Sequence, residues 1–142
     1  MKVVHFVCSG NTYRSRLAEA YFNSKKIPGW KAISSGIHAD RDLHGPISWY
    51  TLTLCREHGL EKFLSPGWRQ TCKEDLEKSD RIVCMEEKHK DYVVELLEKT
   101  VVAIEIWGIE DMPSSLDEKA SMAQAEATFS AISSKIDSVF VV

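Results

Sequence analysis

Residues 2–15 read KVVHFVCSGNTYRS, an apolar run that passes directly into a polar loop. The run is short, β-branched and aromatic, which is typical of a buried strand. The loop contains Gly10 and Asn11, and an amphipathic helix pattern begins at Ser15. A strand, a short loop and a helix in this order indicate the first unit of an α/β fold.

The same alternation continues along the chain. Further strand patterns cover residues 30–35, 81–85 and 101–106, and helix patterns cover 15–26, 47–58, 86–99 and the region after 115, with a short helix after Thr71. Strands that alternate with helices favour right-handed crossovers and a parallel sheet covered on both faces. We therefore expect a single doubly wound, flavodoxin-like α/β domain over residues 1–142, with a four-stranded parallel sheet.

Three helix ends carry local signals. Thr71 with Glu74, and Ser115 with Glu118, have the spacing of capping boxes and predict helix starts. Gly59 is expected to end a helix in the left-handed conformation.

The composition is that of an ordinary globular domain. The 142 residues are 44% hydrophobic and 27% charged, which excludes a disordered chain, a collagen and a small disulfide scaffold. The net charge is −3, and no basic stripe indicates nucleic-acid binding. The apolar runs are too short to span a membrane, and no secretory signal is recognisable, so we expect a cytoplasmic protein without membrane contact. The oligomeric state stays open.

The cysteines and histidines do not indicate a metal or a cofactor. None of the four cysteines has CxxC spacing, and the five histidines match no ligand motif. Cys55 and Cys84 lie in apolar patterns and are expected to be core thiols.

The loop after the first strand places a thiol at its start and a guanidinium at its end. Backbone N–H groups between Cys8 and Arg14 can surround a tetrahedral anion, and the following helix N-terminus adds donors. Gly10 and Asn11 tolerate the positive φ angles that such a loop needs. Arg14 offers a planar fork suited to two phosphoryl oxygens. The loop therefore predicts an oxyanion site.

Cys8 lies in the field of these amides, the helix terminus and the guanidinium, which favours its thiolate near neutral pH. The hydroxyl of Ser15 can add a hydrogen bond to the sulfur. A thiolate below a bound phosphoryl group is an in-line nucleophile, and the product would be a phosphocysteine that water hydrolyses.

The oxygen of the leaving group needs a proton as its bond to phosphorus breaks. Asp111, shortly after the fourth strand, is the best candidate, and the adjacent Glu110 stays open.

These residues resemble the low-molecular-weight protein tyrosine phosphatase family, whose signature is V-C-x-G-N-x-x-R-S followed by A-E. Residues 7–15 and 18–19 match it, and the similarity extends to the acid loop at 107–113. The resemblance implies roles for five residues: nucleophile Cys8, phosphate clamp Arg14, general acid Asp111, loop stabiliser Asn11 and thiolate partner Ser15. The substrate-binding residues are expected to be Ser9, Gly10, Asn11, Thr12, Tyr13 and Ser15.

The resemblance also implies the activity and its partners. We expect a cysteine-dependent tyrosine phosphatase that acts on a tyrosine-phosphorylated protein or a small aryl phosphate, without metal or cofactor.

The sequence departs from the family at several positions. Tyr13 stands where members often have a second cysteine, and Pro66 falls near a position where many have a loop-bracing histidine. Around Arg41, and at Ser114 and Ser115, the aromatic residues that commonly flank a substrate ring are absent. Tyr13 is a candidate replacement at the rim of the site.

Two alternatives belong to other functional classes. An arsenate reductase of the same fold needs two further cysteines after the third strand to resolve its adduct. Residues 85–89 contain none, and Cys84 lies within the strand. A catalytically silent phosphate- or phosphotyrosine-binding module has no use for a nucleophile, so the presence of Cys8, Arg14 and Asp111 together argues against it.

Overall fold

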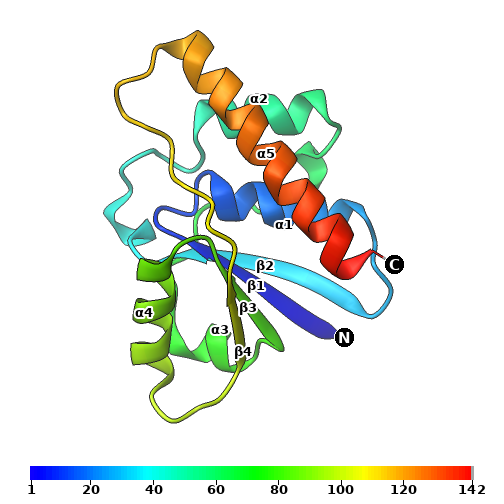
Figure 1. Ribbon diagram of the computed structural model, residues 1–142, viewed down its shortest axis with the longest axis vertical. Helices are drawn as coiled ribbons and strands as arrows, with labels where there is room; N and C mark the ends of the chain where they lie inside the picture. The colour runs from blue at the N-terminus through cyan, green and yellow to red at the C-terminus, as the bar shows by residue number, and fades with distance from the viewer. Residues whose placement is uncertain (142) are drawn as a thin grey trace.

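Four parallel strands form the sheet at the centre of the molecule (Figure 1). The computed structural model describes residues 1–141, and Val142 lies outside the described residues. The strands are β1 (Lys2–Cys8), β2 (Trp30–Gly36), β3 (Arg81–Cys84) and β4 (Ala103–Ile106), in the spatial order β2-β1-β3-β4 with parallel pairing throughout. The predicted four-stranded parallel sheet is confirmed.

Helices cover both faces of this sheet (Figure 1). They are α1 (Arg14–Ser24), α2 (Trp49–Glu57), α3 (Lys73–Glu77), α4 (Glu87–Leu97) and α5 (Glu118–Phe140), with short 3₁₀ turns η1 (Ala39–Arg41) and η2 (Glu61–Phe63). The helices α1 and α5 pack together on one face, and α3 and α4 pack together on the other. No helix in residues 1–141 is both long enough and apolar enough to span a membrane.

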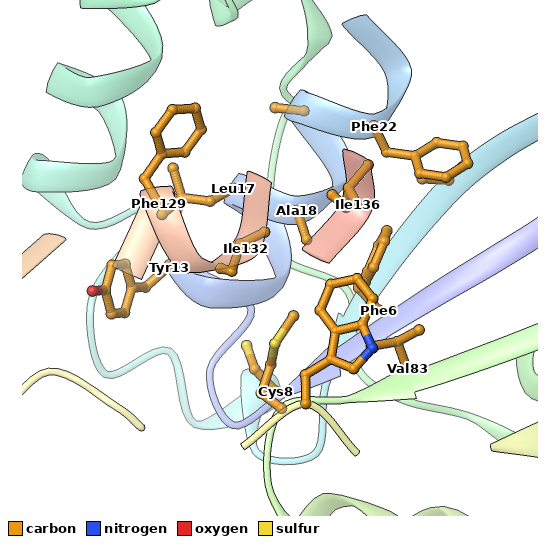
Figure 2. Packing of buried hydrophobic residues seen from close by; sticks show 14 of the residues in the cluster. Phe6, Cys8, Tyr13, Leu17, Ala18, Phe22, Val83, Phe129, Ile132 and Ile136 are labelled. Atoms are coloured by element: carbon orange, nitrogen blue, oxygen red, sulfur yellow. The ribbon is translucent and has the colours of Figure 1, made fainter. Parts of the chain in front are cut away.

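The alternation of side chains along β1 separates two hydrophobic cores. Phe6 and Cys8 point toward α1 and α5, and Figure 2 shows both on that side of the sheet with Val83 of β3. Val7 points to the opposite face, where it packs with Cys84 and the apolar residues of α3 and α4. Cys8 therefore lies at the end of a strand that is buried on both faces.

The order of the strands gathers three loops at one edge. The chain runs from β1 outward to β2 and then returns to β3 on the other side of β1, so the loops after β1 and β3 diverge at a topological switch point. The Met85 N–H donates to the Val7 carbonyl at 3.0 Å, and the Ile109 N–H donates to the Met85 carbonyl at 2.8 Å. The loops after β1, β3 and β4 therefore lie side by side.

The helix ends follow the local signals in part. Gly59 adopts φ +69 after α2, as predicted. The helix start predicted at Ser115 is wrong: α5 is capped by Asp117, whose Oδ1 accepts from the Ala120 N–H at 2.8 Å. Both side chains can cap a helix, and the carboxylate that stands directly before the first helical turn takes the role.

The predicted cap at Thr71 is also displaced. Cys72 is the N-cap of α3 and makes no side-chain capping bond. The Thr71 hydroxyl pairs instead with Ser35 Oγ at 2.7 Å, because β2 lies close enough to supply a buried partner.

Candidate active site

The loop between β1 and α1 ties its carbonyl groups to the segments around it. Four of its carbonyl oxygens accept hydrogen bonds from outside the loop: those of Cys8 (from Ile37 N, 2.9 Å), Ser9 (from His38 N, 2.8 Å), Asn11 (from Arg16 Nη1, 3.2 Å) and Thr12 (from Ser48 N, 3.1 Å). Within the described chain, the backbone N–H groups of residues 9–14 donate no hydrogen bond. Consecutive amides of this kind form a concave site for an anion.

Asn11 holds this loop in shape. It is fully buried with φ 55, and its Nδ2 donates to Ser15 Oγ at 2.7 Å and to Ser34 Oγ at 2.9 Å. Its Oδ1 accepts from the Arg69 N–H at 2.8 Å. Of the two residues expected to tolerate a positive φ, Asn11 adopts one and Gly10 does not.

Cys8 lines the cavity beside this loop and is only 2% exposed. Its Sγ lies 2.9 Å from Ser15 Oγ. Because Ser15 Oγ already accepts from Asn11, its own proton is free to donate to the sulfur. The contact predicted between Cys8 and Ser15 is therefore present.

Arg14 is buried at the N-terminus of α1 and borders the cavity. Its Nη1 donates to Glu86 Oε2 at 2.5 Å and to the Ile109 carbonyl at 2.7 Å. Its Nη2 lies 3.4 Å from Ser9 Oγ and 3.4 Å from Asp111 Oδ2. The loops after β3 and β4 thus hold one side of the guanidinium.

Glu86 and His89 belong to this network, and the sequence reasoning missed both. They form a capping box at the start of α4, in which the Glu86 N–H donates to His89 Nδ1 at 3.0 Å. Burial alone would raise the pKa of Glu86, but the hydrogen bond and charge of Arg14 hold it below its usual range. Their position directly after a strand that ends at the ligand edge was the available signal.

Asp111 and Glu110 differ in their position relative to the cavity. Asp111 lines it, with its side chain 55% exposed, whereas Glu110 is not among the lining residues. Of the two candidates for the general acid, Asp111 is therefore the one with a position beside the proposed substrate site.

Aromatic side chains line the cavity, which has a volume of about 480 Å³. They are Tyr13 in the loop after β1, Trp49 and Tyr50 at the start of α2, and Trp68 in the loop before α3, and Trp49 is 49% exposed. Trp68 is fixed by a hydrogen bond of 2.9 Å from its Nε1 to Asp42 Oδ1. Arg41 and Ser114 also line the cavity, whereas Ser115 and Pro66 do not. Aromatic residues are absent from the two loops where the family commonly has them, but α2 and the loop before α3 contribute aromatic residues to the cavity.

Tyr13 lines the cavity, as expected of a residue at the edge of the site, but almost none of its surface is exposed. Its ring packs edge-on against Tyr50 at 4.9 Å, and Figure 2 shows it in the cluster with Leu17 and Phe129. Burial raises the pKa of Tyr13 to about 12. The helix α5 covers the ring, which the local sequence did not reveal.

Arg16 connects three segments beneath the loop. Its buried guanidinium donates to the carbonyls of Asn11 (3.2 Å), Pro46 (2.9 Å) and Ser65 (2.5 Å). Ser65 immediately precedes Pro66, where the family's bracing histidine is expected. Arg16 therefore braces the loop from a position that the sequence reasoning did not single out.

The remaining cysteines lie apart from this site. Cys55 and Cys84 are buried as expected, and burial raises their pKa values to about 11 and about 12. Cys72 is exposed. No cluster of metal-ligating side chains occurs within residues 1–141.

Comparisons with known proteins give a consistent picture. A sequence model of one family, described as "Low molecular weight phosphotyrosine protein phosphatase", matches residues 3–139. The "Protein-arginine-phosphatase" of Geobacillus stearothermophilus is 31% identical over 90 residues, which is 63% of this chain and 58% of that protein. The "Low molecular weight phosphotyrosine protein phosphatase" of Mus musculus is 33% identical over 93 residues, 62% of this chain and 57% of that protein.

A solved structure matches along its whole length. The low molecular weight protein tyrosine phosphatase of T. tengcongensis superposes with a TM-score of 0.75 at 29% identity, covering 98% of this chain and 100% of that one. By contrast, the matches to the two curated relatives span less than two thirds of their lengths.

Proposed function

Because the chain belongs to the low molecular weight phosphotyrosine protein phosphatase family, we propose that it hydrolyses phosphotyrosine in proteins, and small aryl phosphates, through a phosphocysteine on Cys8. One observation carries this proposal. Carbonyl groups of the loop after β1 accept hydrogen bonds from outside the loop, whereas the backbone N–H groups of residues 9–14 donate none within residues 1–141. Cys8 and Arg14 line the same cavity. A dianionic phosphoryl group fits this arrangement in charge and in shape.

The reaction proceeds in two steps. In the first, Sγ of Cys8 attacks phosphorus, the bond to the aryl oxygen breaks, and Asp111 gives its proton to that oxygen. In the second, Asp111 takes a proton from a water that attacks the phosphocysteine, which releases inorganic phosphate and the thiolate. The loop amides and Arg14 stabilise the charge on the phosphoryl oxygens in both transition states.

The walls of the cavity favour an aryl substrate. Trp49, Tyr50 and Trp68 line it, and aromatic rings pack on one another in offset or edge-on geometry. Cys84 faces the opposite side of the sheet from Cys8, which argues against a thiol relay of the arsenate reductase kind. We also propose a cytoplasmic location, which fractionation of the producing cells tests.

Phosphoarginine in proteins is a second candidate substrate. It is favoured by the similarity to the Protein-arginine-phosphatase of Geobacillus stearothermophilus. Two carboxylates, Asp42 and Asp111, line the cavity and can accept hydrogen bonds from a guanidinium. A phosphotyrosine peptide and a phosphoarginine peptide of the same sequence, assayed side by side, separate the two candidates by their kcat/KM.

The test of the reaction is the variant Cys8→Ser. It should lose turnover of p-nitrophenyl phosphate while it still binds inorganic phosphate, measured by calorimetry. Vanadate, which mimics the five-coordinate transition state, should inhibit the parent protein, and EDTA should not. Hydrolysis by Cys8→Ser at the parent rate would show that the mechanism is wrong.

A further inference from the structure

His89 links helix α4 to the loop after β1. The imidazole is fully buried, with Nε2 3.0 Å from Ser9 Oγ and Nδ1 3.0 Å from the Glu86 backbone nitrogen. Ser9 lines the cavity, whereas His89 does not. The histidine thus stands behind a side chain that faces the proposed substrate.

The hydrogen bonds of His89 determine its tautomer. A backbone N–H can only donate, so Nδ1 must be the acceptor in its bond with Glu86, and the ring proton lies on Nε2. Burial, with a smaller contribution from the charge of Arg14, lowers the pKa of His89 to about 4, so the ring is neutral at ordinary pH. Nε2 therefore donates to Ser9 Oγ.

This donation limits what the Ser9 hydroxyl can do. A hydroxyl has two acceptor positions and one proton. His89 occupies one acceptor position, and Arg14 Nη2, which also can only donate, lies 3.4 Å from the same oxygen. No acceptor for the Ser9 proton is found within residues 1–141, so the proton is available to a group in the cavity.

We propose that Ser9 Oγ donates a hydrogen bond to an oxygen of the bound phosphoryl group, and that His89 is the positioning residue that turns this hydroxyl toward it. The inference rests on the proposed function and deepens it, because it adds a side-chain donor to the amides of the loop. Hydrogen bonds to a charged acceptor are stronger than those to a neutral one, so the donor should matter for affinity.

The first experiment compares Ser9→Ala with Ser9→Thr. We measure the inhibition constant of inorganic phosphate, together with kcat and KM for p-nitrophenyl phosphate. Ser9→Ala should weaken phosphate binding about tenfold, the effect of one charge-assisted hydrogen bond. Ser9→Thr keeps a hydroxyl and should recover most of that loss. An inhibition constant in Ser9→Ala equal to that of the parent overturns the proposal.

The second experiment separates the two nitrogens of His89. Asn places an acceptor near Nδ1 and can keep the bond from Glu86, but it does not reach Ser9. Gln extends to the position of Nε2 and can donate to Ser9, but it gives up the capping bond. The proposal therefore predicts that His89→Asn weakens phosphate binding as Ser9→Ala does, and that His89→Gln weakens it less.

A purely structural role for His89 predicts the reverse order, because the helix cap would then be what matters, and that result contradicts the proposal. The double variant Ser9→Ala/His89→Asn should bind phosphate as Ser9→Ala alone does, since His89 acts through Ser9. Melting temperatures of all variants identify any that fail to fold, and in that case the Ser9 pair decides. If the parent protein neither binds phosphate nor turns over substrate, the proposed function itself fails, which is a different result from parent activity with an unaffected Ser9→Ala.

Discussion

Arg14 Nη1 and Glu86 Oε2 form an ion pair of 2.5 Å across the switch point of the sheet. The Arg14 side chain is 1% exposed and that of Glu86 is 29% exposed, so solvent screens the pair only partly. Because Nη1 is occupied by Glu86 and by the Ile109 carbonyl, the guanidinium can turn only its Nε and Nη2 side to a ligand. Glu86 therefore fixes which edge of Arg14 the phosphoryl group meets.

Glu86→Gln should weaken catalysis without direct contact to substrate. The amide keeps the size of the side chain but removes the charge, and Arg14 is left with Asp111 as its nearest anion. We expect about a tenfold fall in kcat/KM for p-nitrophenyl phosphate, since misplacement of a binding group is costly, and a loss of about 2 kcal/mol of stability in urea. The neighbouring exposed residue gives the control Glu87→Gln, and equal kinetics in the two variants would contradict the role of Glu86.

Gly36 is required by close packing against the loop after β1. A Cβ at this position would lie 2.5 Å from the Ser9 carbonyl oxygen and 2.7 Å from the Asn11 nitrogen. Both are backbone atoms, so the clash cannot be relieved by turning a side chain; Gly36→Ala should displace the loop itself and reduce phosphate binding at least tenfold, as measured by calorimetry. Gly67→Ala, where a Cβ meets nothing within 4 Å, is the matched control and should bind as the parent does.

Asp111→Asn should slow the departure of poor leaving groups most. Protonation by a positioned acid contributes typically about 10²–10⁴-fold, and the need for it grows with the basicity of the leaving oxygen. The variant should therefore lose more activity toward phenyl phosphate than toward p-nitrophenyl phosphate in single-turnover assays. Glu110→Gln serves as the control. A uniform loss for both substrates, or a larger effect at Glu110, would assign the acid elsewhere.

The sequence predicted those parts of the fold and site that depend on local order. The strand pattern of residues 2–7 and the loop that follows are contiguous, so periodicity and residue type sufficed for β1 and for the pairing of Cys8 with Ser15. Asp111 was found because parallel strands bring their carboxyl ends to one edge.

The parts that were missed depend on tertiary contacts. Glu86, Arg16 and Trp49 reach the site from three different segments, and no local pattern says which side chains meet there. The burial of Tyr13 was missed for the same reason, since it is due to α2 and α5, which are distant in the chain.

The buried histidines His5 and His89 predict a pH-dependent stability. Burial is the main cause that lowers the pKa of each from 6.5 to about 4. Between pH 6.5 and about 4 the unfolded chain therefore binds protons that the folded chain does not. The free energy of unfolding has the full contribution of these histidines above this pH window. It falls as the pH decreases through the window, by about 1.4 kcal/mol per pH unit for each histidine.

Urea denaturation at several pH values measures this slope. His5→Gln should reduce this slope by about 1.4 kcal/mol per pH unit, the contribution of one histidine. A slope that His5→Gln does not change would show that other groups cause the pH dependence.

Arg16 provides the last prediction, because it combines buried hydrogen bonds with a buried charge. Its acceptors are the carbonyls of Asn11, Pro46 and Ser65, and its charge offsets part of the rise that burial causes in the pKa of Glu19. Since the peptide plane is trans, holding the Asn11 carbonyl toward Arg16 turns the next N–H the opposite way, toward the cavity.

Arg16→Met should therefore lose both stability, by about 3–5 kcal/mol, and phosphate affinity. Adding Glu19→Gln to that variant removes a buried carboxylate that has lost the charge of Arg16, so the double variant should regain part of the lost stability against urea. It should not regain phosphate affinity, because the Asn11 carbonyl still lacks its donor. Recovery of both properties together would mean that Arg16 only balances charge and does not hold the loop.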